Sequence, residues 1–333
     1  MKGLLKVVRF GCLAFLILAS AFMYWMSQVF SPAKTTSEQV VIEVPPGATG
    51  GEVAELLEKR GVIRSAFALR LLMRVTTDMQ VQAGHYEVDP SKSPLLILKD
   101  LSHAQPLSRK ATLPEGLTLP EVCDVLGKEK VVSDPKRLLA FVREKGQTID
   151  KSLPANLEGY LFPDTYEFGW DATEEEVVRQ MTGRFREVVD PMWAKHKKKA
   201  PLSLRETVIL ASLVEREAQV SSERPLIAGV YINRLKKGML LQCDATVQFA
   251  LGAPKKVLTY DDLKLESPYN TYLHAGLPPG PIANPGKASL EAAMSPERSP
   301  YLFYVRNDVK GDGSHVFSRT YEEHNDAIRK YQR

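Results

Sequence analysis

The feature that most constrains the fold of this chain is an apolar run without a charged residue, from Phe10 to Phe30. At about 1.5 Å of rise per residue, a helix of this length spans a bilayer core of about 30 Å. Three basic residues precede the run: Lys2, Lys6 and Arg9. Because positive charges stay on the cytoplasmic side of a membrane, the sequence predicts a cytoplasmic tail at 1–9, a single transmembrane helix at 10–30 and export of the remainder.

A cleaved signal peptide is the alternative interpretation of the same run. Residues 19–21 (Ala-Ser-Ala) form a small-residue site of the kind that signal peptidases cut, after a short apolar core. The apolar residues continue past that site to Val29 and Phe30, which favours the anchor. Both interpretations export the body of the protein, and the polar stretch 31–39 is then a linker.

Composition and charge exclude several classes of function. Of the 333 residues, 44% are hydrophobic and 25% are charged, which is ordinary for a folded protein. The net charge of +4 is small and three of the positive charges lie in the tail, so we expect no nucleic-acid partner. The cysteines Cys12, Cys123 and Cys243 form no CxxC pair, and the six histidines are scattered. We therefore expect no disulfide, no metal site and no cofactor.

The segment 40–103 has the pattern of a small α/β module. Short runs rich in β-branched residues predict strands, and apolar residues at helical spacing predict helices. The expected elements are a strand at Val40–Val44, helices at 49–59 and 65–74, a strand at Gly84–Val88 and a helix at 93–101. This order resembles that of a LysM-like module, and an unspecified small α/β domain is the alternative.

The segment 104–333 has the pattern of a larger mixed domain. Helices are expected at 118–126, 135–145, 174–195, 204–217 and 223–237, and a connecting strand at 109–113. Strand patterns at 301–305 and 315–317 flank a Gly-Asp-Gly-Ser turn and predict a hairpin, and Thr320 is placed to cap a final helix. We therefore predict an α+β fold, with a transmembrane helix, a small LysM-like module and a larger mixed domain.

The helix expected from Leu204 carries the first candidate for chemistry. Its centre, 208–214, is apolar apart from Ser212, and a helix that is apolar nearly all round is normally buried. This helix runs into two carboxyl groups, those of Glu215 and Glu217. Glu217 continues the face formed by the residues three, four and seven positions before it: Val214, Leu213 and Leu210.

A carboxyl group on an apolar face loses hydration, which raises its pKa. A carboxylic acid that is still protonated near neutral pH can serve as a general acid, and Glu217 is therefore our candidate. The alternative is that Glu215 and Glu217 are both solvated residues at a helix end, with Arg216 and Arg224 as partners. Further along, Asp244 is expected to cap a helix at 245–250.

Long motifs then follow in order along the chain. They are ASLVEREAQVSSERPLIAGVYINRLKKGMLLQCDATVQFALG, YNTY, GLPPGPIANPG and SPYLFYV, preceded by EGYLFPDTY. With the anchor and the LysM-like segment, they resemble the endolytic murein transglycosylases of the YceG-like family over nearly the whole chain. The resemblance implies that 104–333 is a YceG-like catalytic domain and that Glu217, the second Glu of the V-E-[KR]-E motif, is its catalytic residue. Cys243 departs from the small polar residue expected at its position.

The resemblance implies a lytic reaction with one carboxyl group. Glu217 would protonate the glycosidic oxygen between N-acetylmuramic acid and N-acetylglucosamine, and would then accept the proton of the muramic 6-hydroxyl as a 1,6-anhydro ring closes. Candidates for holding the sugars are Gln242, Asn233, Tyr231, Asn270 and Tyr272, with Glu158 and Asp164 of the aromatic-rich stretch 157–166 as a second tier. Each could instead be a polar group with its hydrogen bonds satisfied in the core.

Partners and location follow from the same resemblance. It implies peptidoglycan glycan strands as the substrate, synthases of the elongation or division machinery as partners, and a single-pass protein of the bacterial inner membrane with a periplasmic catalytic domain. Two alternatives stay open. One is a membrane-anchored glycan-binding or division scaffold without catalysis, and the other is a hydrolase that uses Asp244 or Glu223 as a second carboxylate.

Overall fold

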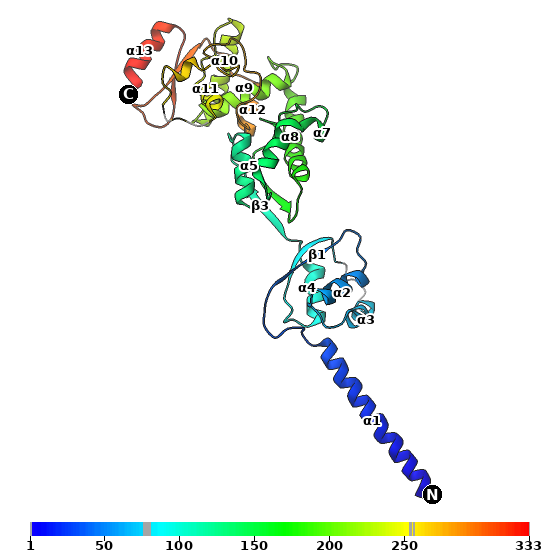
Figure 1. Ribbon diagram of the computed structural model, residues 1–333. Helices are drawn as coiled ribbons and strands as arrows, with labels where there is room; N and C mark the ends of the chain where they lie inside the picture. The colour runs from blue at the N-terminus through cyan, green and yellow to red at the C-terminus, as the bar shows by residue number, and fades with distance from the viewer. Residues whose placement is uncertain (1, 76–80, 253–254, 256, 333) are drawn as a thin grey trace. The chain divides into compact units, whose positions relative to one another are not determined.

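The computed structural model describes residues 2–75, 81–252, 255 and 257–332. It divides into two compact units, Met1–Arg109 and Lys110–Arg333 (Figure 1). Both contain helices and short strands, so the fold is mixed α+β as the sequence predicts. Each unit has its own hydrophobic core, and each is described here by itself.

The first unit begins with the long helix α1 (Lys2–Phe30). Within it, Phe10–Ser27 is apolar and long enough to cross a membrane, and its side chains are not buried by the rest of the protein. The helix coincides with the run predicted from the sequence and extends it backwards to Lys2. The anchor therefore stays a prediction, beside the cleaved signal sequence as its alternative.

The remainder of the first unit is a small α/β module. Its elements are β1 (Val40–Val44), α2 (Gly50–Lys59), α3 (Ala66–Val75), β2 (Gly84–Val88) and α4 (Pro94–His103). The two strands are antiparallel, with Val40 opposite Val88. Alternate strand residues such as Ile42 and Tyr86 point into a core shared with Leu57 and Leu98. The element order is the predicted one, while the likeness to LysM modules stays a prediction.

The second unit is larger and mostly helical. Its elements are β3 (Ser108–Thr112), α5 (Leu119–Lys128), α6 (Pro135–Glu144), α7 (Gly146–Ile149), β4 (Thr165–Gly169), α8 (Glu174–His196), α9 (Leu204–Glu217), η1 (Ser221–Glu223), α10 (Arg224–Lys236), α11 (Asp244–Leu251), η2 (Asp262–Lys264), α12 (Lys287–Met294), β5 (Phe303–Arg306), β6 (His315–Ser318) and α13 (Tyr321–Tyr331). Strand β3 pairs with β4, and β5 pairs with β6 as the predicted hairpin.

Helix α9 lies at the centre of this unit and packs against α10, α11 and α12 (Figure 1). Every residue from Thr207 to Val214 is buried, which confirms the expectation drawn from its apolar sequence. Ser203 caps its first turn in a capping box with Glu206, so the start of the helix is fixed. A buried and capped helix therefore holds its last residue, Glu217, at a defined place in the core.

Candidate active site

Glu217 stands at the point where α9 ends. Ala218, the residue that follows it, has extended backbone angles, and its N–H still donates to the carbonyl of Val214. The residues before it on the same face, Leu210, Leu213 and Val214, are buried, and so is Ala218 after it. The carboxyl group is thus set in an apolar wall.

The contacts of this carboxyl group are neutral hydrogen-bond donors. The Cys243 thiol donates to Oε1 at 3.2 Å, and the Tyr304 phenol donates a second hydrogen bond. Among the described residues, Glu217 forms no ion pair. Burial raises the pKa of Glu217, the nearby charge of Asp244 raises it further, and the two donors and His315 oppose the rise. Burial dominates, so this carboxyl group holds its proton to a higher pH than an ordinary Glu.

Tyr231 completes a closed ring of contacts around the carboxyl group. Its hydroxyl lies 2.8 Å from the hydroxyl of Tyr304 and also contacts the Cys243 sulfur. The ring therefore runs from Glu217 through Cys243, Tyr231 and Tyr304 back to Glu217. Tyr231 and Cys243 are each 1% exposed, so the donors have little competition from water and keep the carboxyl group in one orientation.

A second layer holds Tyr304 in place. The ring of His315, on β6, meets the Tyr304 ring edge to face, with centroids 5.2 Å apart. His315 Nδ1 lies 2.8 Å from a Glu223 carboxylate oxygen, and its backbone N–H donates to both oxygens of that carboxylate. Glu223 precedes α10, so the hairpin and the helix pair α9–α10 are joined behind the acid.

Three polar residues lie at the rim of the site. Asp244 is exposed and accepts a hydrogen bond from the Tyr272 hydroxyl. The helix cap predicted for Asp244 is wrong, because Asp244 is the first residue of α11 and its side chain turns to Tyr272 instead. Gln242 is exposed between two buried neighbours and has a φ of +50°, a conformation that costs a non-glycine residue energy and that clusters at functional sites.

Two of the predicted sugar contacts bind backbone instead. Asn233 donates to the carbonyls of Ser299 and Tyr301 at 2.8 and 2.9 Å. Asn270 is fully buried, donates to the carbonyls of Leu263 and Leu265, and accepts from the Tyr272 N–H. Both side chains tie loops to the site, so the structure brings them to its walls while their amide groups are occupied.

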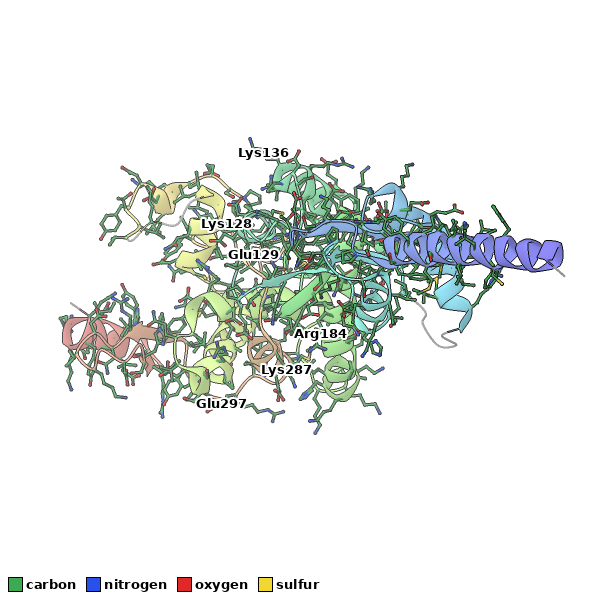
Figure 2. All side chains as sticks on the ribbon, turned by 90° about the horizontal axis from the view of Figure 1, so that it is seen from below. Lys128, Glu129, Lys136, Arg184, Lys287 and Glu297 are labelled. Atoms are coloured by element: carbon green, nitrogen blue, oxygen red, sulfur yellow. The ribbon has the colours of Figure 1, made fainter. Side chains whose placement is uncertain are left out.

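The second-tier candidates lie apart from the ring. Glu158 is buried and accepts the N–H of Leu119 at the start of α5, and burial raises the pKa of Glu158 to about 8. Asp164 forms an ion pair with Arg184 of α8 at 2.7 Å, and both line an open hollow of about 580 Å³ between β4 and α8. Figure 2 labels the side chain of Arg184. Asp164 therefore lies beside a hollow with room for a ligand, whereas Glu158 is buried and its contacts lie within the core.

Glu215 has surroundings of the opposite kind. Its Oε1 lies 3.3 Å from Arg224, in an ion pair whose side chains are 6% and 11% exposed, and its Oε2 accepts the N–H of Gly286 at the start of α12. The Glu115 carboxyl group packs against Gly286, and its pKa is raised by burial and by the charge of Glu215. Of the two partners considered in the sequence, Arg224 pairs with Glu215, and Arg216 donates to the Gly116 carbonyl.

The sequence did not single out Tyr304, His315 or the contact of Cys243 with Glu217. Tyr304 and His315 were placed in the correct hairpin, but a strand pattern does not say which residue faces a helix end far away in the chain. Cys243 was noticed only as a departure from the expected residue. Among the described residues, no group of three His, Cys, Asp or Glu side chains is placed to hold a metal ion.

Comparison with known proteins covers most of this chain. The model of the YceG-like family matches residues 42–330. A Bacillus subtilis (strain 168) protein named endolytic murein transglycosylase is 34% identical over 95% of this chain and 91% of its own length. A namesake from Streptococcus pneumoniae D39 is 28% identical, and this chain spans 65% of it. The structure of a yceG-like protein from Listeria monocytogenes superposes with a TM-score of 0.58 at 33% identity, covering 87% of this chain and 99% of that one.

Proposed function

This chain belongs to the YceG-like family, and from that premise we propose that it is an endolytic murein transglycosylase, a lyase of glycan strands, with Glu217 as its general acid and then its base. One observation carries the assignment of the residue. Glu217 ends a buried helix, its carboxyl group is held by neutral donors, and burial raises the pKa of that group. A carboxyl group in such surroundings can give up a proton and take one back near neutral pH.

In the first step the protonated Glu217 transfers its proton to the glycosidic oxygen of a muramic acid residue, and the bond from C1 to that oxygen breaks. The ionised carboxylate that remains accepts the hydrogen bonds of Cys243 and Tyr304, and these donors need no reorganisation because the ring already holds them. In the second step the muramic 6-hydroxyl attacks C1 while Glu217 takes its proton. The products are an anhydro end and a free hydroxyl, and no water is consumed.

The rim residues are our candidates for holding the sugar. Gln242 is exposed in a strained backbone conformation, and Tyr272 is partly exposed beside Asp244. We assign these two the hydrogen bonds to the saccharide that lie nearest to the acid. Tyr231, Asn233 and Asn270 act behind them, because their polar groups are engaged within the protein.

A hydrolase is the second candidate, and Asp244 is the observation that favours it. Its exposed carboxylate acts electrostatically on Glu217, so it lies in the neighbourhood where a water-activating base would be needed. Glu223, the other carboxylate considered in the sequence, is occupied by the ring and the backbone N–H of His315. Hydrolysis through Asp244 would leave reducing ends, whereas the lytic reaction leaves anhydro ends.

We further propose that α1 anchors the enzyme in the inner membrane, with its N-terminus in the cytoplasm and the rest of the chain in the periplasm. The length of Phe10–Ser27, its lack of burial and the basic residues before it support this placement. The small module is our candidate for the LysM-like part. Peptidoglycan synthases that make the strands are the partners that this placement implies.

The test is mass spectrometry of purified glycan strands digested by the full chain in detergent, beside Glu217→Gln. Glu266→Gln removes an exposed charge from the same unit and is the matched control. We expect anhydromuramyl products from the parent and the control, and none from Glu217→Gln. Products that carry the added mass of water would establish the hydrolase, and binding of strands without cleavage by the parent would establish the scaffold.

A further inference from the structure

The small module of the first unit carries exposed apolar side chains that its own core does not use. Leu95 and Leu96, in the first turn of α4, are 45% and 50% exposed, while the next two residues of the helix are fully buried. On the neighbouring helix α3, Phe67 and Leu71 lie one turn apart and are 60% and 43% exposed. Exposed apolar side chains that lie next to one another in this way are uncommon on a surface that contacts only water.

The linker that leads from α1 is tied to the module a few residues from these leucines. The Lys34 N–H donates to the carbonyl of Pro90, and the Ser37 hydroxyl donates to the carboxylate of Asp89 at 2.8 Å. From there the chain makes a tight turn, in which the Lys92 N–H donates to the Asp89 carbonyl, and enters α4 directly. The attachment point and the exposed leucines therefore belong to one end of the module.

The free part of the linker is very short. Helix α1 ends at Phe30, and among the described residues the first backbone hydrogen bond from the linker to the module is at Lys34. Val29 is already buried, so at most residues 31–33 lie free between them. Four extended steps reach at most about 14 Å, and about 18 Å if the count starts at Ser27. The headgroup layer itself takes up about 5–8 Å of this distance. The attachment point at Lys34 therefore stays within about 6–13 Å of the headgroups, and this end of a module on the order of 25 Å across remains next to the bilayer.

From these observations we propose that the module docks on the lipid surface through Leu95 and Leu96, which enter the boundary between headgroups and acyl chains. The proposal rests on the proposed membrane anchor. Lipid is favoured over glycan as the occupant because a leucine offers a sugar neither an aromatic face nor a hydrogen-bonding group.

The test places an environment-sensitive fluorophore on Leu96→Cys in the full chain, reconstituted in nanodiscs that contain nitroxide-labelled lipid. Cys12→Ser removes the exposed native thiol, and the remaining cysteines, Cys123 and Cys243, are buried. His103→Cys is the matched control, because position 103 is exposed on the same helix face, two turns and about 10 Å further along. A label on the native Cys12 reports whether α1 itself is in the bilayer.

We expect the label at 96 to lose about half of its fluorescence to shallow lipid quenchers, because interfacial side chains enter about 5–10 Å, and the label at 103 to lose much less. An unquenched label at 96, with Cys12 quenched, overturns the docking and leaves the anchor intact. Equal quenching at 96 and 103 also overturns it, since proximity without insertion gives that result. If Cys12 is not quenched either, the anchor fails. If soluble glycan strands, without lipid, change the fluorescence of the label at 96, the surface would be assigned to glycan instead.

Discussion

Glu215 and Glu217 are separated by one residue on the same helix, and the protein treats them in opposite ways. Glu215 is placed against a guanidinium and a helix N-terminus, in an ion pair that is almost fully buried. Glu217 is placed against a thiol and a phenol, with no cation bonded to it among the described residues. The first arrangement stabilises charge and joins α9, α10 and α12. The second keeps a proton on the carboxyl group to a higher pH, which is why we assign the chemistry to Glu217 and a structural role to Glu215.

The comparison shows why burial alone does not identify an acid. Both carboxyl groups end the same apolar helix, and both are withdrawn from water. What separates them is the partner, because a cation favours the ionised form while neutral donors around a desolvated carboxyl group leave burial in control. The following substitutions would break or sharpen this distinction.

The largest effect is expected from Glu217→Gln. Loss of the acid should lower the rate of strand cleavage by about 10²–10⁴-fold. The folded-state pKa of Glu217 is raised, so its contribution to stability is present at low pH and is lost as pH rises through that pKa. The Gln variant should therefore be at least as stable as the parent above neutral pH, as measured by urea unfolding. An inactive variant that is also less stable would mean that Glu217 acts as a structural residue.

Glu215→Gln should show the reverse pattern. It leaves Arg224 buried without a counter-charge, and breaking a buried pair in this way costs about 3 kcal/mol. We expect a lower urea midpoint with the rate of strand cleavage retained at temperatures where the variant is folded. A variant of unchanged stability but without activity would place Glu215 in the chemistry and would remove the contrast with Glu217.

Tyr304→Phe tests whether the neutral donors tune the acid. Cleavage requires protonated Glu217, so kcat/KM falls as pH rises through the pKa of that group. Removing a donor to the ionised form raises this pKa, and the fall should move to higher pH by about 0.5–1 unit. Cys243→Val should move it in the same direction. Cys243→Thr retains a donor and is the matched control, so a shift of equal size there would exclude the hydrogen bond as the cause.

The smallest effect is expected from Asp244→Asn. Its carboxylate raises the pKa of Glu217, so removing the charge should move the fall in kcat/KM to lower pH. Because Asp244 is exposed, the shift should be about 0.3 units and should shrink as salt is added. Loss of all cleavage in this variant, with water-bearing products in the parent, would identify Asp244 as the base of a hydrolase.

Most helices and strands of this protein can be predicted from its sequence, because they depend on interactions between residues a few positions apart. The capping box of Ser203, the helices of the small module and the hairpin at the C-terminal end follow from spacing and turn residues that act over a few positions. The helix face of Glu217 is equally local, and its burial is as predicted. Asp244 shows where such local rules fail. Its carboxylate accepts a hydrogen bond from Tyr272, which lies in a distant loop, and does not cap the helix as expected.

The ring around Glu217 lies beyond such rules. Tyr231, Cys243 and Tyr304 come from a helix, a loop and a strand, and only the packing of α9 against its neighbours brings them to one carboxyl group. Their spacing in the chain carries no periodic signal. A residue type that departs from expectation, as Cys243 does, was the one indication in the sequence that something unusual faced the acid.

The end of α9 at Glu217 has a consequence for how this protein responds to heat. Helix α9 does not continue past the acid, since Ala218 is already extended, and the Ala218 N–H closes the last turn with a hydrogen bond to the Val214 carbonyl. Helix termini open far more often than helix centres, at a free-energy cost well below that of global unfolding. Activity should therefore be lost when this single turn frays, at temperatures where the fold is still intact. The rate of amide exchange at Ala218 should rise over the same temperature range as activity is lost.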